Sequence, residues 1–176
     1  MFSQVLGQER AKEFLQRAIK GARLSHAYLF TGIAGVGKAT MGRALAMALN
    51  CEEASGDDGC GHCSACRSIM SGNSPDYLCV RRRPEKKDIS IEQIRDELNR
   101  RIAFPPFPGK TRVCIIHETE TMSREASNSF LKTLEEPPPR NVFVLKAVEP
   151  RNLLPTIVSR CQRVAFHPLP YGLIAG

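Results

Sequence analysis

A glycine-rich turn followed by a lysine constrains the fold of this chain more than any other segment. Residues 27–30 form a short apolar run, the turn 31–37 follows, and from residue 41 apolar side chains recur at spacings of three and four. This order of strand, turn and helix is typical of a phosphate-binding loop, in which backbone amides turn toward phosphate oxygens and the lysine reaches the outer phosphates. The sequence therefore predicts a nucleotide site at Gly32, Gly35, Gly37 and Lys38.

The residues that should hold magnesium at such a site are replaced. The position after Lys38 is normally Ser or Thr, whose hydroxyl binds Mg²⁺, but here it is Ala39. Thr40 comes one residue late, which turns its side chain by about 100° around a helix. The apolar run 113–116 should end in Asp-Glu, and it ends in His117-Glu118. An imidazole is a poor ligand for Mg²⁺, so we expect weak or absent ATP or ADP binding and no turnover. The alternative is an active ATPase in which water or Thr40 substitutes.

Strands alternate with helices along the rest of the chain. A capping box, Ser90 with Gln93, begins one amphipathic helix. The pattern predicts an α/β fold with a mainly parallel sheet and helices on both faces. We expect one domain over residues 1–167, and a tail, 168–176, that leads to further domains. The expected strands are 27–30, 76–80, 113–116, 142–145 and 163–166, and the main expected helices are 9–24, 38–49, 91–102 and 123–134.

Four of the seven cysteines are spaced as C-x8-C-x2-C-x2-C: Cys51, Cys60, Cys63 and Cys66. Paired C-x2-C steps suit a tetrahedral zinc ion, and a closed set of four thiolates indicates a structural metal. We therefore predict a small zinc-binding insertion over residues 51–71. His26 and His62 are alternative ligands, although packed or solvated histidines are commoner. The other thiols, Cys79, Cys114 and Cys161, are predicted to be core residues.

The net charge of +7 suits an anionic partner. Residues 81–83 are all arginine, and two lysines follow at 86–87. These charges allow an alternative function, a zinc-ribbon nucleic-acid module with a vestigial phosphate loop, but no aromatic residues interleave with them for base stacking. We find no apolar run long enough to cross a membrane and no signal peptide, so we expect a cytoplasmic protein without a membrane partner.

Longer stretches of sequence resemble the clamp-loader branch of the AAA+ ATPases. They are GQERAKEFLQRAI, RLSHAYLFTGIAGVGKATMGRALAMALNC, NSFLKTLEEPPPRNVFVL and LLPTIVSRC. The resemblance covers nearly the whole chain and implies a five-stranded AAA+ core with lid and collar domains beyond it. It also implies a ring that opens a sliding clamp onto primed DNA, with gamma/tau and delta subunits as partners.

Within that resemblance, Arg160 of the Ser-Arg-Cys motif matches an arginine finger, which acts in the ATP site of a neighbouring subunit. The family's first sensor, Thr or Asn, is expected near Ala147 and is missing. The residues that would support ATP hydrolysis within this chain are thus replaced, while the arginine that would act in the ATP site of a neighbour is present. This asymmetry predicts a static ring member. The alternative is a motor subunit of the gamma/tau type.

Overall fold

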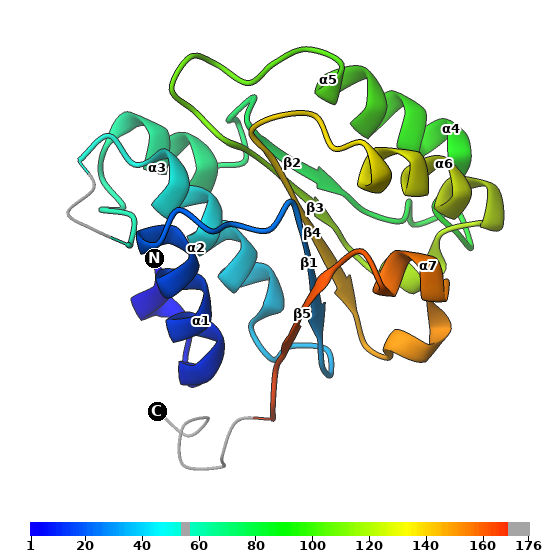
Figure 1. Cartoon of the computed structure of the whole chain (residues 1–176), viewed down its shortest axis with the longest axis horizontal. Helices are drawn as coiled ribbons and strands as arrows, with labels where there is room; N and C mark the ends of the chain where they lie inside the picture. The colour runs from blue at the N-terminus through cyan, green and yellow to red at the C-terminus, as the bar shows by residue number, and fades with distance from the viewer. Residues whose placement is uncertain (54–56, 169–176) are drawn as a thin grey trace.

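The computed structural model describes residues 1–53 and 57–168. Its centre is one parallel sheet with the strand order β2-β3-β4-β1-β5 (Figure 1). The order places the two strands that end at the expected phosphate and magnesium positions, β1 and β3, on either side of β4. The strands are β1 (Ala27–Thr31), β2 (Tyr77–Val80), β3 (Arg112–Ile116), β4 (Asn141–Ala147) and β5 (Gln162–Ala165).

Helices cover both faces of the sheet (Figure 1). One face carries α1 (Glu9–Lys20), α2 (Lys38–Asn50) and α3 (Ser64–Met70). The other carries α4 (Ile91–Gln93), α5 (Arg100–Ile102), α6 (Arg124–Glu135) and α7 (Pro155–Val158). A π-helical segment, Ile94–Asn99, joins α4 to α5, and single 3-10 turns form at Phe2–Gln4, Thr119–Thr121 and Pro150–Asn152. The predicted α/β sheet with helices on both faces is confirmed.

The central strand shows how the two cores are built. Val142 and Val144 of β4 pack into the core under α1 and α2, whereas Phe143 and Leu145 pack into the core under α4, α6 and α7. Successive side chains of a strand point to opposite faces, so this alternation fixes which residues can reach the α2 side of the sheet. Lys146 continues this alternation and lies on the same face of the sheet as Val142 and Val144.

A buried ion pair fixes the segment before β3. Arg112 and Asp76 lie 3.2 Å apart (N to O), and each side chain is only 6% exposed. The Arg112 guanidinium also donates hydrogen bonds to three backbone carbonyls between residues 101 and 105. It thereby ties the proline-rich loop after α5 to the sheet.

Some details differ from the predictions. The first helix ends at Lys20, before the expected residue 24, because Gly21 closes the last turn and Ala22 adopts a left-handed conformation with φ of 49°. The segment 51–71, predicted as an irregular insertion, contains helix α3. Cys79 is exposed, and its prediction as a core thiol is wrong. It lies on edge strand β2, where its side chain points to the face opposite the buried Leu78 and Val80. Cys114 is buried, and Cys161 is partly buried.

Along the described chain, no helix has both the length and the apolar character that a membrane crossing requires. Most of the expected tail, residues 169–176, lies outside the described residues.

Candidate nucleotide pocket and cysteine cluster

The glycine-rich turn connects β1 directly to α2. Gly35 and Gly37 have φ values of 80° and 97°, a left-handed conformation that side chains with a Cβ rarely adopt. This backbone brings Lys38 to the first position of α2. The Lys38 ammonium donates hydrogen bonds to the carbonyls of Gly32 and, at 2.6 Å, Ile33. Burial lowers the pKa of Lys38, while the Glu120 carboxylate opposes that shift.

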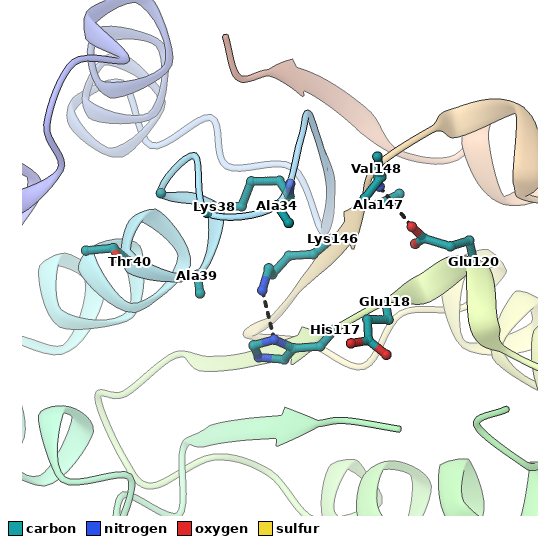
Figure 2. A pocket seen from close by; sticks show the side chains of 12 residues that line it. Ala34, Lys38, Ala39, Thr40, His117, Glu118, Glu120, Lys146, Ala147 and Val148 are labelled. Atoms are coloured by element: carbon teal, nitrogen blue, oxygen red, sulfur yellow. Dashed lines mark hydrogen bonds between the residues drawn. The ribbon is translucent and has the colours of Figure 1, made fainter. Parts of the chain in front are cut away.

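A cavity of about 290 Å³ opens beside this turn. Its walls come from the turn, from the start of α2 and from the ends of β3 and β4, and they include Ala39, Thr40, Glu118 and Ala147. Figure 2 shows Ala39 on the side of the helix that faces His117, and Thr40 turned away from it. The hydroxyl of Thr40 therefore does not take the place of the missing serine or threonine.

His117 and Lys146 form a pair across this cavity. His117 directly follows β3, and Lys146 is the second-last residue of the neighbouring strand β4. The Lys146 Nζ lies 2.8 Å from the His117 Nδ1 (Figure 2). His117 is only 8% exposed. Burial, with the charges of Lys146 and Arg81, lowers its pKa to about 3, so the imidazole is neutral and accepts the hydrogen bond. Burial also lowers the pKa of Lys146, and the nearby charges of Lys38 and Arg81 add to that shift.

The residues of this pocket do not fit a magnesium ion. Mg²⁺ requires hard oxygen ligands in near-octahedral geometry. At the two expected protein positions the pocket offers the methyl group of Ala39 and the imidazole of His117. The ammonium of Lys146, bound to that imidazole, adds a positive charge at the same place. Sequence reasoning missed Lys146, although its place in the alternating pattern of β4 indicates the face to which it points.

The two carboxylates near the pocket are each held by other groups. Glu118 accepts a hydrogen bond from Arg82 Nε at 3.0 Å, and Arg82 is itself fixed by a bond to the Lys86 carbonyl. Glu120 accepts a hydrogen bond from the Val148 amide at 2.9 Å. Glu118 is thus retained in sequence, but its carboxylate is paired with a guanidinium.

Arg160 is not among the residues that line this pocket. It follows α7, where its guanidinium contacts Glu135 of α6 at 2.9 Å and donates to the Thr156 carbonyl. The Arg160 and Glu135 side chains are 35% and 50% exposed. Ala147, at the expected sensor position, lies in the pocket wall and offers only a methyl group.

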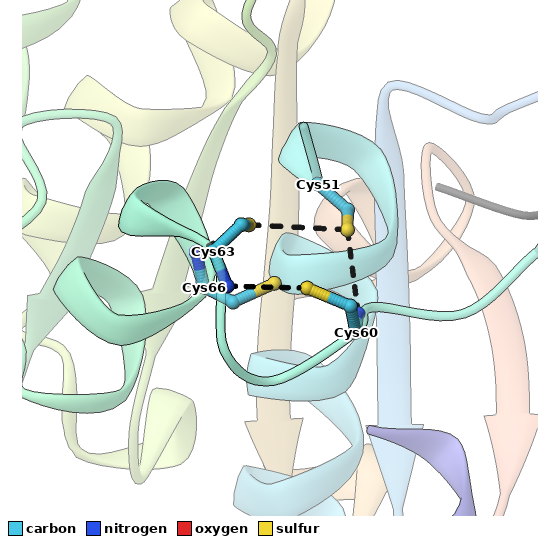
Figure 3. Close-up of side chains that lie close together, drawn as sticks. All are labelled: Cys51, Cys60, Cys63 and Cys66. Atoms are coloured by element: carbon cyan, nitrogen blue, oxygen red, sulfur yellow. Dashed lines mark hydrogen bonds between the residues drawn. The ribbon is translucent and has the colours of Figure 1, made fainter. Parts of the chain in front are cut away.

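The four predicted zinc-binding cysteines come together (Figure 3). Their sulfurs all lie within 4.8 Å of one another, and those of Cys51 and Cys63 are 4.0 Å apart. Four thiolates around a tetrahedral zinc ion, with bonds of about 2.3 Å, would have sulfurs about 3.8 Å apart. The cluster therefore fits a zinc ion. His62 lies in a different group with Glu53 and Cys60, and it is exposed.

Backbone amides point at these sulfurs. The amides of Cys60, Cys63 and Cys66 each donate to the sulfur of another cysteine in the cluster, at 3.2–3.4 Å. Burial opposes ionisation of Cys63, but hydrogen bonds from the Glu52 and Cys66 amides outweigh it and lower the pKa of this thiol to about 6. Burial raises the pKa of Cys66 to about 12. Amide donors around sulfur favour the thiolate form, which is the form that binds a metal.

The basic loop after β2 is partly neutralised. Arg82 pairs with Glu118, and Arg83 pairs with Glu97 at 3.0 Å. Because two of the three arginines are bound to carboxylates within the chain, the loop presents less free charge than the sequence indicates.

The sheet order, the glycine-rich turn at the start of α2 and the pocket beside it define a P-loop domain of the AAA+ type. Solved structures support this fold. A gamma subunit-related DNA polymerase III protein of Thermotoga maritima superposes with a TM-score of 0.60 at 24% identity, covering 94% of this chain and 47% of that one. The RuvB Holliday junction branch migration motor of the same organism superposes with a TM-score of 0.58 at 15% identity, covering 96% of this chain and 48% of that one. At these identities the likeness shows the fold alone.

Sequence relatives identify the family. The chain is 38% identical over 175 residues to DNA polymerase III subunit tau of Bacillus subtilis, and 36% identical over 149 residues to subunit delta' of Pseudomonas aeruginosa. These matches cover 99% and 85% of this chain, but only 30% and 45% of the relatives. The family model described as "DNA polymerase III, delta subunit" matches residues 7–170. The chain therefore belongs to the DNA polymerase III clamp-loader subunit family, which includes delta prime and tau/gamma.

Proposed function

We propose that this chain is the nucleotide-binding-type domain of a delta prime subunit, the static member of a DNA polymerase III clamp loader. One observation carries the proposal. The pocket keeps the phosphate-loop lysine but has a methyl group and an imidazole–ammonium pair where magnesium ligands should be. Such a pocket binds Mg·ATP weakly or not at all and does not hydrolyse it, because phosphoryl transfer depends on the metal to neutralise developing charge.

Arg160 gives this static subunit a role in hydrolysis by a neighbour. It lies outside its own pocket and is held by a half-exposed carboxylate, an interaction typically worth about 0–1 kcal/mol. Glu135 can therefore be exchanged at little cost for the more highly charged phosphates of a neighbouring ATP. We propose that Arg160 is an arginine finger supplied in trans to a gamma/tau motor subunit.

The proposed setting follows from the family. The partners are the gamma/tau and delta subunits, the sliding clamp and, in the assembled ring, primed DNA, and the compartment is the cytoplasm. Cys51, Cys60, Cys63 and Cys66 are proposed to hold one structural Zn²⁺. The metal would crosslink the end of α2 to α3 and take no part in phosphoryl transfer.

The competing candidate is a gamma/tau-type motor, which the relatives named tau favour by sequence. The two candidates differ in how ATP turnover of the reconstituted ring responds to Lys38→Ala in this chain. In a motor, which needs its neighbour's arginine finger, this variant would abolish the subunit's own share of ring turnover, whereas in a static subunit it would leave ring turnover unchanged. A ring that loses part of its turnover when this chain carries Lys38→Ala would establish the motor and refute our proposal.

Reconstitution with motor and delta subunits, clamp and primed DNA tests the arginine finger. The full-length subunit carrying Arg160→Ala should assemble normally, but the adjacent motor site should slow by about 10³-fold or more, so the ring loses that site's share of turnover. Arg151→Ala is the matched control, since Arg151 is an exposed arginine near α7 that makes a surface pair with Glu149. Equal turnover of the Arg160→Ala ring and the unmodified ring would remove the assignment.

A further inference from the structure

The ammonium of Lys146 is an unexpected charge in the wall of the candidate pocket. We propose that Lys146 replaces the magnesium ion, so that the pocket binds a metal-free polyphosphate chain, either alone or as the triphosphate of a nucleotide. The inference depends only on the pocket of this chain and does not require the role proposed for Arg160.

The position of Lys146 follows from the sheet. Val142, Val144 and Lys146 alternate along β4 and point to the α2 face, as do Val113 and Ile115 on the neighbouring strand. Val142 and Val144 are buried in the core, whereas Lys146, near the end of the strand, is only partly buried and lines the cavity. The ammonium therefore lies beside the P-loop, on the side where Ala39 and His117 replace the metal ligands (Figure 2).

The partner of Lys146 leaves its charge available. His117 accepts the hydrogen bond at 2.8 Å as a neutral imidazole, so it orients the ammonium without neutralising it. An aspartate at position 117 would have cancelled the charge. The pair is thus a fixed monovalent cation at a place where related sites hold a divalent one.

Two like charges face the same cavity. Lys38 and Lys146 both line it, and the charge of Lys38 contributes to lowering the pKa of Lys146. A bound anion relieves this repulsion. Of the two carboxylates that line the pocket, Glu118 pairs with Arg82, whereas Glu120 accepts from the Val148 amide and keeps a negative charge that opposes the lowering of the Lys38 pKa by burial. Polyphosphate, with several charged oxygens, can contact both lysines and the amides of the turn at once.

This arrangement reverses the usual effect of magnesium. Mg²⁺ bound to a triphosphate removes two negative charges and brings a cation to the space that Lys146 fills. Metal-free ligand should therefore bind more tightly than the magnesium complex.

Isothermal titration of the purified chain with inorganic tripolyphosphate and, separately, ATP tests the proposal, each in EDTA and in excess Mg²⁺. Both ligands should bind in EDTA, and Mg²⁺ should weaken binding by about fivefold or more. Lys146→Met should weaken binding in EDTA by about tenfold or more and remove the preference for metal-free ligand. Lys146→Arg, which keeps the positive charge, should retain part of the affinity and part of the preference. Lys132→Met, at an exposed lysine of α6, is the matched control and should change neither value.

Tighter binding in Mg²⁺, no binding in EDTA, or equal binding by Lys146→Met and the unmodified chain would each overturn the proposal. Binding of ATP without binding of tripolyphosphate would also overturn it, because the phosphate chain would then not be the recognised group. Circular dichroism of each variant confirms that a lost affinity is not lost folding. The Arg160 assay measures a different site, so either proposal can fail without the other.

Discussion

Restoring the two magnesium ligands should not by itself restore a magnesium site. The change is Ala39→Ser together with His117→Asp, which gives the pocket both oxygen ligands that the sequence lacks. Lys146 already lies 2.8 Å from the side chain at position 117. A new carboxylate there would pair with the ammonium before it could bind a metal ion.

The size of the effect follows from this contact. Two unit charges 4 Å apart interact by about 4 kcal/mol at an effective dielectric constant of 20. Every 1.4 kcal/mol corresponds to a factor of ten, so 4 kcal/mol is about a thousandfold in metal affinity. Solvent reaches the partly buried ammonium and weakens the pair. We therefore expect the double variant to bind Mg²⁺ about 100- to 1,000-fold more weakly than a triple variant that also carries Lys146→Ala.

The assay is a Mg²⁺ titration of ATP affinity for the double and triple variants. The triple variant should show ATP binding that tightens with Mg²⁺ in the low millimolar range or below, and the double variant should not. Lys146→Ala alone is the control, since it removes the ammonium without adding a ligand. Equal Mg²⁺ dependence in the double and triple variants would refute the reasoning, because Lys146 would then not compete with the metal.

Three further predictions concern metal, pH and stability. Metal analysis of the chain should give about one equivalent of zinc, lost in Cys60→Ser but kept in Cys79→Ser, an exposed thiol outside the cluster; a folded chain purified without metal would exclude the site. The pKa of His117 is about 3 in the folded chain and about 6.5 in the unfolded one, so only the unfolded chain takes up this proton between those pH values, and stability falls as pH falls. His117→Gln should reduce the slope of unfolding free energy against pH, in that window, by up to about 1.4 kcal/mol per unit, and an unaltered slope would contradict the assignment. In urea denaturation, Arg112→Met should cost about 3–5 kcal/mol because it leaves a buried carboxylate unpaired, whereas Arg100→Met, at an exposed pair, should cost less than about 1 kcal/mol. Similar losses in the two variants would show that burial of the pair does not matter.

Periodicity and capping predicted most of the fold. Ser90 accepts a hydrogen bond from the Gln93 amide and starts its helix as predicted, although the Gln93 side chain donates to the Arg81 carbonyl and Glu97. All five expected strands form within a residue or two of their predicted bounds. The π-helical stretch after Gln93 was not predictable, because the same apolar spacing suits an α-helix. Helix α3 was missed since the cysteines and glycines around it dominate the local pattern. Its start is fixed by the Cys63 sulfur, which accepts from the Cys66 amide.

The candidate pocket was predicted only in part. The glycines, Lys38 and Ala39 belong to one turn, and His117 stands where the second magnesium element of the motif is expected, so both could be assigned from the sequence. Lys146 belongs to no motif, and it looks like an ordinary charged residue at the end of an apolar run. Its role depends on the strand order, which places β4 between β1 and β3. Sequence periodicity predicts the face of the sheet to which a side chain points, but it does not predict which strand lies next to it.

Helix α2 links the two sites that the sequence indicated separately. Its first residue, Lys38, lies in the pocket, and Cys51 of the cysteine cluster follows its last residue. A helix of 13 residues is about 20 Å long, so a metal held by the cysteines is too far away to contact a ligand in the pocket. It could affect the pocket only through the position of α2, which Cys63 and Cys66 fix by packing α3 against its buried face. Loss of the proposed metal should therefore lower the free energy of unfolding first, and weaken binding in the pocket only as far as α2 moves.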